Sequence, residues 1–250
     1  MTAMLEVRDV SKHFGSLRAV QGVSMSVAPG ELRAIIGPNG AGKTTFFNTI
    51  SGFFPPTSGD IVFNGDVVTK RSVSERVAMG MARTFQITEI FPELTVRENI
   101  RIGAESAAGL KLKLWRGKTT ADEVEGRINE LLGLVGLSGK ADRLVGELSH
   151  GDQRSAEIGM ALTLRPKLLL LDEPTAGMGE QETYQIAALI RRLHKNSNYT
   201  IVLIEHDMRV VFNLADRISV LDQGKLLADG TPAEIAADPH VQAAYLGKAE

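Results

Sequence analysis

The sequence has no cysteine, few aromatic residues and little net charge. Without cysteine, the chain has no disulfide framework, no cysteine nucleophile and no thiolate zinc site. With a formal net charge of -2 and an aromatic content of 5%, the chain also lacks the excess of basic residues and the many aromatic side chains with which proteins bind nucleic acids. We therefore expect no nucleic-acid partner.

Long hydrophobic runs are missing as well. The strictly apolar segment Ile186 to Ile190 is among the longest, whereas a bilayer-spanning helix needs roughly 18 apolar residues. The first eight residues, Met-Thr-Ala-Met-Leu-Glu-Val-Arg, do not form the basic and then apolar regions of a secretory signal. We expect a chain that is soluble by itself, and the absence of cysteine fits a cytoplasmic compartment.

The 250 residues suffice for one large domain or two small ones. Apolar runs bounded by glycine and proline predict strands within residues 4–36, and after Pro166 short strands alternate with helical patterns. Residues 93–165 repeat leucine and alanine at spacings of three and four, which predicts helices. The order predicts an α/β fold with a largely parallel sheet and a helical subdomain inserted in its middle.

Residues 37–44 match the phosphate-loop pattern G-x-x-x-x-G-K-[ST] in full. The glycines let backbone N–H groups turn inward around phosphate oxygens, and the following helix adds the positive end of its dipole. Lys43 would reach the β- and γ-phosphates and Thr44 would offer its hydroxyl to Mg²⁺. A chance glycine-rich turn is the alternative, but the predicted strand before the loop and helix after it favour a P-loop NTPase core. The loop residues are Gly37, Pro38, Asn39, Gly40, Ala41, Gly42, Lys43 and Thr44.

Two adjacent carboxylates, Asp172 and Glu173, end the apolar run 168–171. At the end of a strand, Asp172 can hold Mg²⁺ directly or through water, and Glu173 can orient or deprotonate an attacking water. Alone, such a pair would more simply be two solvated acids. Together with a complete phosphate loop, it favours a hydrolytic site.

Four further segments resemble the motifs of ATP-binding cassette (ABC) ATPases in order and spacing. Residues 148–154, Leu-Ser-His-Gly-Asp-Gln-Arg, resemble the signature motif, and residues 84–86, Thr-Phe-Gln, resemble the Q-loop. Residues 204–207, Ile-Glu-His-Asp, resemble the switch-histidine segment, and residues 172–178 resemble the Walker B and D-loop region. The chain is identified as a member of this family, which implies ATP and Mg²⁺ as cofactors.

The resemblance also implies an organisation for the whole chain. It would be a single cassette, residues 1–250, with an N-terminal antiparallel β subdomain and an inserted α-helical subdomain. The ATP-binding core with the β subdomain would occupy residues 1–92 and 166–250. The helical signature subdomain would occupy about 93–165.

The resemblance implies roles for individual residues. Phe14 matches the aromatic that stacks on adenine, although a core phenylalanine is the alternative. Gln86 would sense Mg²⁺ or the attacking water and couple the site to the helical subdomain, and His206 would contact the γ-phosphate. The implied catalytic residues are Lys43, Gln86, Glu173 and His206; the implied metal ligands are Thr44, Gln86 and Asp172; the implied ATP-binding residues are Phe14, residues 37–44, Thr45, Ser149 and Gly151.

The signature loop of this family acts in trans, because two cassettes pack head to tail. A serine hydroxyl and backbone N–H groups at a helix N-terminus form an anion site, so Ser149 and Gly151 would contact ATP held by a second cassette. The implied partner is a second ABC ATPase subunit, identical or related.

The sequence departs from the family pattern at three positions. His150 replaces a glycine and Asp152 a glutamine of the usual signature, and Gly179 occupies the aspartate position of the D-loop. An acid beside a γ-phosphate adds repulsion unless it turns outward to favour the dipole of its own helix. Two interpretations stay open, pairing with a non-identical partner and neutral drift within a subfamily.

A finer resemblance is to the ATP-binding subunits of bacterial branched-chain amino-acid importers. It rests on residues 14–20, 81–87 and 172–178, and the insert after residue 100 favours the larger of that system's two cassette types. It implies a heterodimer on the cytoplasmic face of the inner membrane, beneath two permeases served by a periplasmic binding protein. Relatives that import urea, amides or aromatic acids, the ATPase of lipopolysaccharide export, and non-transport ABC proteins are the alternatives.

The insert contains a basic segment, residues 110–118, with four basic residues, no acid and the only tryptophan. It would cover the helical subdomain as a solvated helix, or lie against a permease loop or the anionic inner leaflet.

Overall fold

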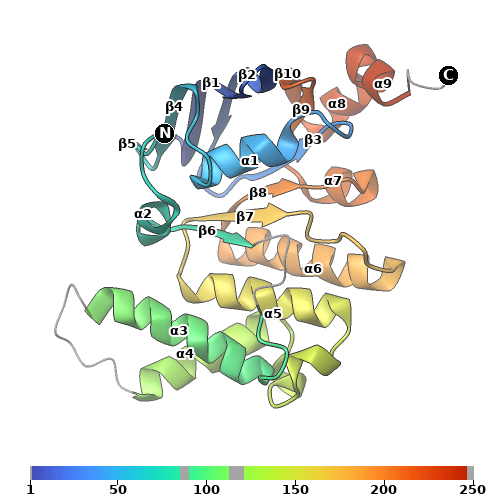
Figure 1. Cartoon of the computed structure of the whole chain (residues 1–250). Coiled ribbons are helices and arrows are strands. Elements are labelled where there is room, and N and C mark those ends of the chain that lie inside the picture. The colour runs from blue at the N-terminus through green and yellow to red at the C-terminus, as the bar shows by residue number, and fades with distance from the viewer. Residues whose placement is uncertain (1, 85–89, 113–120, 247–250) are drawn as a thin grey trace.

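A computed structural model describes residues 2–84, 90–112 and 121–246 (Figure 1). The first half contains strands β1 (Leu5–Phe14), β2 (Leu17–Val27), β3 (Leu32–Ile36), β4 (Ser58–Phe63), β5 (Asp66–Val67) and β6 (Met81–Thr84), and helices α1 (Lys43–Ser51), α2 (Val73–Ala78) and α3 (Val96–Leu112). The second half contains helices α4 (Ala121–Leu134), α5 (His150–Thr163), α6 (Glu180–Ser197), α7 (Met208–Leu214), α8 (Pro232–Ala237) and α9 (Pro239–Leu246), and strands β7 (Leu168–Asp172), β8 (Thr200–Ile204), β9 (Arg217–Asp222) and β10 (Lys225–Gly230). Two 3₁₀ helices, Ser138–Lys140 and Val145–Glu147, precede α5.

The larger sheet has the strand order β10-β9-β3-β8-β7-β6. The pairs β9–β3, β3–β8, β8–β7 and β7–β6 are parallel, and β10 pairs antiparallel with β9. Every residue of β3, β7 and β8 is buried, as expected for parallel strands covered on both faces. The predicted α/β core is confirmed.

The smaller sheet has the order β2-β1-β4-β5, and all its pairs are antiparallel. It confirms the antiparallel sheet expected at the N-terminus. Its strands β1 and β2 extend well beyond the alternation visible in the sequence, because register shifts interrupt their pairing and blur the periodicity. Helix α2 and strand β6 lie in a stretch for which the sequence predicted no element, and β6 forms the edge of the larger sheet.

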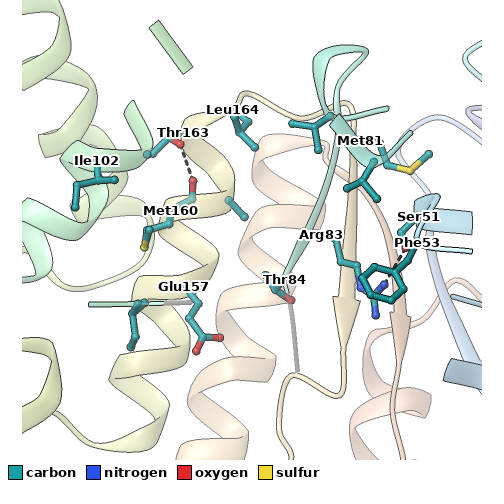
Figure 2. Close-up of a pocket in the computed structure, with 15 residues that line it drawn as sticks. Ser51, Phe53, Met81, Arg83, Thr84, Ile102, Glu157, Met160, Thr163 and Leu164 are labelled. Carbon is teal, nitrogen blue, oxygen red and sulfur yellow. Dashed lines mark hydrogen bonds between the residues drawn. The ribbon is translucent and has the colours of Figure 1, made fainter. Parts of the chain in front are cut away.

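Helices α3, α4 and α5 lie together beyond α6, on the side of the larger sheet away from the smaller one (Figure 1). A cavity of 330 Å³ opens between this helical layer and the edge of the core. Figure 2 shows Ile102 and Met160 on its helical side and Met81, Arg83 and Phe53 facing them. None of the helices that the structure describes is both long and apolar enough to cross a membrane.

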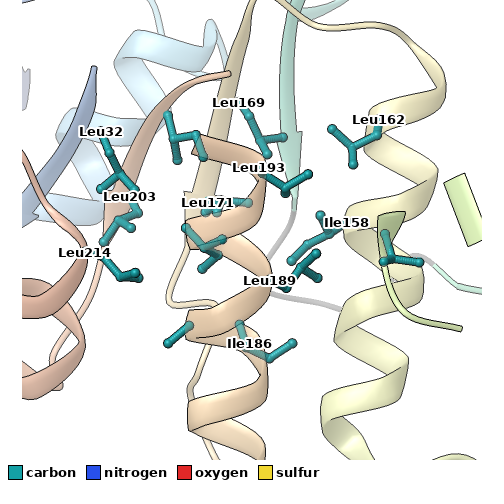
Figure 3. Close-up of a cluster of buried hydrophobic side chains, with 14 of the residues drawn as sticks. Leu32, Ile158, Leu162, Leu169, Leu171, Ile186, Leu189, Leu193, Leu203 and Leu214 are labelled. Atoms are coloured by element: carbon teal, nitrogen blue, oxygen red, sulfur yellow. The ribbon is translucent and has the colours of Figure 1, made fainter. Parts of the chain in front are cut away.

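Alternating residues of the central strands pack into two separate apolar clusters. Leu169 and Leu171 join helices α5 and α6 in one cluster (Figure 3), whereas Leu168 and Leu170 pack with α1 and the smaller sheet in the other. Because strand side chains point to opposite faces in turn, one short apolar strand holds both layers in place.

We expect Leu203→Ala, in the middle of β8, to lower the free energy of unfolding by about 2–5 kcal/mol because it leaves a cavity in a packed core. Leu203 is fully buried in the helix-side cluster. The matched control is Val67→Ala, on a side chain that is 61% exposed, which should change the value by no more than about 0.5 kcal/mol. Urea unfolding measures both, and equal effects would contradict the described packing.

Candidate functional site

The loop of residues 37–42 joins the end of β3 to the start of α1, and two of its glycines are required by close contacts with strands β9 and β2. At Gly37 φ is +153°, and a Cβ would lie 2.1 Å from the carbonyl oxygen of Leu221. At Gly42 φ is +94°, and a Cβ would lie 2.2 Å from the carbonyl oxygen of Ala19. No side chain fits at either point, so only glycine lets the backbone approach its neighbours this closely.

Lys43, the first residue of α1, is buried inside this loop. Its Nζ donates to the carbonyl oxygens of Gly37 at 2.7 Å and of Pro38 at 3.0 Å. Burial lowers the pKa of the Lys43 amine, and the charge of Glu173 acts in the opposite direction. The amine is therefore positioned by the loop itself, next to an acid from a distant segment.

Asp172 ends β7 with its side chain 1% exposed. One oxygen, Oδ2, accepts a hydrogen bond from Arg83 Nη2 at 2.7 Å. The other, Oδ1, is buried and has no hydrogen-bond partner among the described residues. A buried carboxylate oxygen without a donor suits a hard cation that takes oxygen ligands, so Asp172 fits Mg²⁺. Thr44, another predicted ligand, lines the cavity of the phosphate loop, whereas Asp172 is not among the residues that line it.

Arg83 is a site residue that the sequence did not reveal. It lies on β6, and besides Asp172 it donates to Asn48 Oδ1 at 2.6 Å and to Ser51 Oγ at 2.8 Å, both on α1. The buried negative charge of Asp172 is thus compensated. The sequence predicts no strand at residues 81–84, so it gives no direction for the Arg83 side chain, which the pairing of β6 with β7 determines.

Glu173 and His206 are in direct contact, His206 Nε2 with Glu173 Oε1. Glu173 has a φ of +45°, which is uncommon for a residue with a side chain, and its N–H donates to the Ile204 carbonyl at 3.0 Å. The turn after β7 is therefore fixed to the end of β8. A backbone strained at this point is typical of functional sites.

The phosphate loop, Glu173 and His206 line one cavity of 580 Å³. Lys43, Thr44, Thr45, Asn39, Gly40, Ala41 and Gly42 contribute from the loop and α1. Further walls that the sequence did not predict are Leu17, Arg18, Ala19 and Gln21 from β2, and Gln223 and Gly224 from the β9–β10 turn. Backbone hydrogen bonds from Gly224 N to the Ala41 carbonyl oxygen at 3.0 Å and from Gln21 N to the Gly224 carbonyl oxygen at 2.7 Å hold the β9–β10 turn against the phosphate loop and β2.

Phe14 is not among the residues that line this cavity. Its ring lies edge-on to Phe54, with centroids 5.3 Å apart, and the ammonium of Lys12 is 5.0 Å from its centroid. The side chain is 42% exposed, so it is not a core phenylalanine. Stacking on adenine stays a prediction.

The signature residues lie apart from the cavity. Ser149 caps α5, where its Oγ accepts a hydrogen bond from the Asp152 N–H at 3.3 Å. The Asp152 carboxylate pairs with Lys140, which offsets its negative charge. Ser149 and Gly151 do not line the cavity that holds Lys43. The helix that they begin nevertheless contacts the end of β7, because Arg154 Nη2 donates to the Asp172 carbonyl oxygen at 2.6 Å.

Glu182, on α6, is a second residue that the sequence did not reveal. Its carboxylate accepts from the N–H groups of Gly151 at 3.2 Å and Gly179 at 3.4 Å. The first of these bonds is the main cause that lowers the pKa of Glu182. One acid therefore links the signature loop to the segment that resembles the D-loop.

Two features singled out in the sequence fall on residues that the structure does not describe. Gln86 lies outside the described residues, and so do residues 113–118 of the basic segment 110–118. The proposed role of Gln86 in Mg²⁺ binding and coupling therefore stays a prediction.

Comparisons with known proteins agree on one family. The family model described as ABC transporter matches residues 20–176, and one described as branched-chain amino acid ATP-binding cassette transporter matches residues 225–250. The chain is 40% identical, over 98% of both chains, to the high-affinity branched-chain amino acid transport ATP-binding protein LivG of Escherichia coli.

Solved structures show the same likeness. The ADP conformation of an ATP-binding cassette from an ABC transporter superposes with a TM-score of 0.86 and 33% identity, covering 99% of this chain and 100% of that one. A dimeric cassette in a post-hydrolysis state, bound to ADP and phosphate, gives a TM-score of 0.76 and 25% identity over 92% of this chain and 99% of that one.

We expect Gly42→Ala to weaken binding of a fluorescent ATP analogue by about 10- to 100-fold, because a Cβ 2.2 Å from the Ala19 carbonyl oxygen displaces the loop from the shape that binds phosphate, at a cost of about 1–3 kcal/mol of binding free energy. Gly40→Ala is the matched control, since Gly40 also has a positive φ but a Cβ there would meet nothing within 4 Å. Its strain is present with or without nucleotide and should change affinity by no more than about threefold. Fluorescence titration measures both, and equal losses would contradict the described loop geometry.

Proposed function

The chain belongs to the ABC transporter family, and from this premise we propose that it is the ATP-hydrolysing subunit of a bacterial importer for branched-chain or related amino acids. The observation that carries the hydrolytic function is the cavity that brings together the phosphate loop, Glu173 and His206. The cargo follows from the name of the relative LivG, which matches this chain along almost its entire length. The proposed location is the cytoplasmic face of the inner membrane.

Hydrolysis follows from the positions of the chain's own groups. The N–H groups of the phosphate loop and the Lys43 ammonium bind the phosphates of ATP, while Glu173 takes a proton from the attacking water. The water oxygen bonds to the γ-phosphorus as the bond to the ADP oxygen breaks, giving ADP and phosphate. His206 binds the γ-phosphate and, through its contact with Glu173, orients the base.

Mg²⁺ would be held by Thr44, Gln86 and Asp172, and when bound it neutralises charge on the β- and γ-phosphates. The free Oδ1 of Asp172 supports this assignment. Arg83 keeps the other oxygen of Asp172 in place, so the carboxylate has one defined orientation toward the ion.

A second cassette completes the site in this proposal. Ser149 and Gly151 stand outside the chain's own cavity and would contact ATP held by a partner cassette packed head to tail. The single cassette would comprise residues 1–250, with the helical subdomain at about 93–165. The unusual residues His150, Asp152 and Gly179 lie on this shared face and leave Lys43, Glu173 and His206 intact.

The apolar cavity between the helical layer and the core is the proposed docking site of the permease partner. Its walls include Phe53, Ile102 and Met160 (Figure 2), which present apolar surface to an amphipathic segment of another chain. Thr84 also lines it, two residues before Gln86 in the sequence. A segment bound there would press on the part of the chain that leads to the proposed Mg²⁺ ligand.

We expect Glu173→Gln to lower ATP turnover by at least about 100-fold, because the amide cannot take the proton. ATP binding should persist, so the variant should form an ATP-dependent dimer, measured by light scattering with and without ATP. Lys43→Ala is the comparison variant, and it should fail to bind ATP and to dimerise. Turnover of Glu173→Gln equal to that of the unchanged chain would refute the assignment of the base.

We expect Ile102→Glu to reduce the permease recovered with the tagged chain from membranes by about tenfold, because a charge enters the apolar contact. The matched control is Leu227→Glu on β10, since Leu227 is 36% and Ile102 38% exposed. ATP binding should be unchanged in both. Equal recovery from the two variants would exclude this docking site, and the identity of the recovered permeases tests amino-acid import against the other transport systems.

A further inference from the structure

Glu205 is a buried acid between the end of β8 and His206. Its side chain is 2% exposed, and both oxygens are fully used. Oε1 accepts from Thr175 N at 2.9 Å and from Thr175 Oγ1 at 2.6 Å. Oε2 accepts from His206 N at 2.9 Å and from Asp207 N at 3.4 Å.

All four donors come from two loops, one after β7 and one after β8. These strands are parallel neighbours in the sheet, so their carboxyl ends lie side by side. The first loop carries Glu173 and Thr175, and the second carries His206. Glu205 therefore binds both loops that carry the residues facing each other across the proposed reaction centre.

The backbone alone joins these loops at a single point, the bond from Glu173 N to Ile204 O. That bond fixes the start of each loop and leaves the next residues to be held by side chains. Glu205 supplies the second point, because it reaches Thr175 beyond Glu173 and the N–H of His206 itself. Together, the backbone bond and the Glu205 carboxylate hold the two loops at a fixed distance and limit their rotation relative to each other.

A carboxylate is suited to this place because it offers acceptor oxygens on both sides. The four donors satisfy its lone pairs, and hydrogen bonds to an ionised acceptor are short and strong. Glutamine has nearly the same shape, but its NH₂ group would face donors on one of the two loops. Aspartate is one methylene shorter and cannot bridge the loops without moving one of them.

We propose that Glu205 is the positioning residue that holds His206 in register with Glu173, so that the imidazole can bind the base and the γ-phosphate together. The inference rests on the proposed ATPase function. Thr175 belongs to the segment that resembles the Walker B and D-loop region, and so Glu205 also ties His206 to the loop that would face the partner cassette. A movement of the loop after β7 would therefore move His206 through the Glu205 side chain.

In the full-length chain, we expect Glu205→Gln to lower kcat by about 10- to 100-fold, as a shift of about 1 Å at a reacting group does. The affinity for ATP should change by no more than about twofold, because residues 37–45 are untouched. The matched control is Asp229→Asn, which removes an acid that pairs with Arg33 and Arg217 on β3 and β9. Asp229 does not line the cavity, so this substitution should lower the free energy of unfolding and leave the kcat of the folded protein unchanged.

A merely structural role is separated from positioning by adding the same change to His206→Ala. If Glu205 acts through His206, then Glu205→Gln should lower the residual single-turnover rate of that variant by no more than about twofold. The same 10- to 100-fold loss in both backgrounds, a kcat of Glu205→Gln equal to that of the unchanged chain, or a loss confined to ATP affinity would each overturn the proposal.

A third readout does not depend on turnover. In the chain labelled with ¹⁵N-histidine, the backbone N–H of His206 should move upfield in Glu205→Gln because its hydrogen bond weakens, while the other four of the five histidines stay in place. An unmoved His206 resonance would refute the positioning role even where the unchanged chain hydrolyses ATP. An unchanged chain that binds and hydrolyses no ATP, with a shifted resonance, would instead refute the proposed function alone.

Discussion

The parallel pairing of β3, β8 and β7 is the constraint on which the site depends. Each of these strands ends in a loop that contributes one part of the cavity: the phosphate loop after β3, Glu173 after β7 and His206 after β8. Because parallel strands bring their carboxyl ends to one edge of the sheet, residues more than a hundred positions apart become neighbours. The apolar clusters on both faces hold the strands in this order, so the core fixes the geometry of the site.

Charge compensation is the second requirement, since several charged groups lie where water is largely excluded. Asp172 is compensated by Arg83 from the edge strand β6, Lys43 is held by loop carbonyls beside Glu173, and Glu205 receives only uncharged donors. A buried charge without such partners would be strongly destabilising. The arrangement leaves one carboxylate oxygen, Asp172 Oδ1, unpaired at the place where a cation is expected.

The sequence predicted the parts of the site that consist of short motifs of neighbouring residues. The phosphate loop, the acid pair at 172–173 and the histidine at 206 each follow an apolar run that is a strand in the structure, so their positions could be derived from pattern and spacing. Arg83, Glu182 and Glu205 could not be found in this way, because each has at least one partner 30 or more residues away. The residues next to each of them in the sequence do not predict which distant segment its side chain will contact.

The β subdomain is a second case in which the sequence pattern does not show which residues face the site. The motif predicts Phe14 at the adenine, which stays a prediction, but it does not reveal that Leu17, Arg18 and Ala19 from the adjoining strand line the cavity near the loop. The register shifts between β1 and β2 turn residues to faces that a simple alternation does not give.

In the single chain, the signature loop is not free to bind a nucleotide phosphate. In the described conformation the Gly151 N–H is bound to Glu182, and the same carboxylate holds Gly179. Both an incoming γ-phosphate and this carboxylate are anions that would take the same donor, so the two cannot occupy it together. If Gly151 contacts the γ-phosphate held by a partner cassette, as proposed, then Glu182 must release its N–H. In the described conformation Lys140 compensates the charge of Asp152, so Glu182 is the acid bound to the Gly151 N–H at which the proposed partner's phosphate would bind.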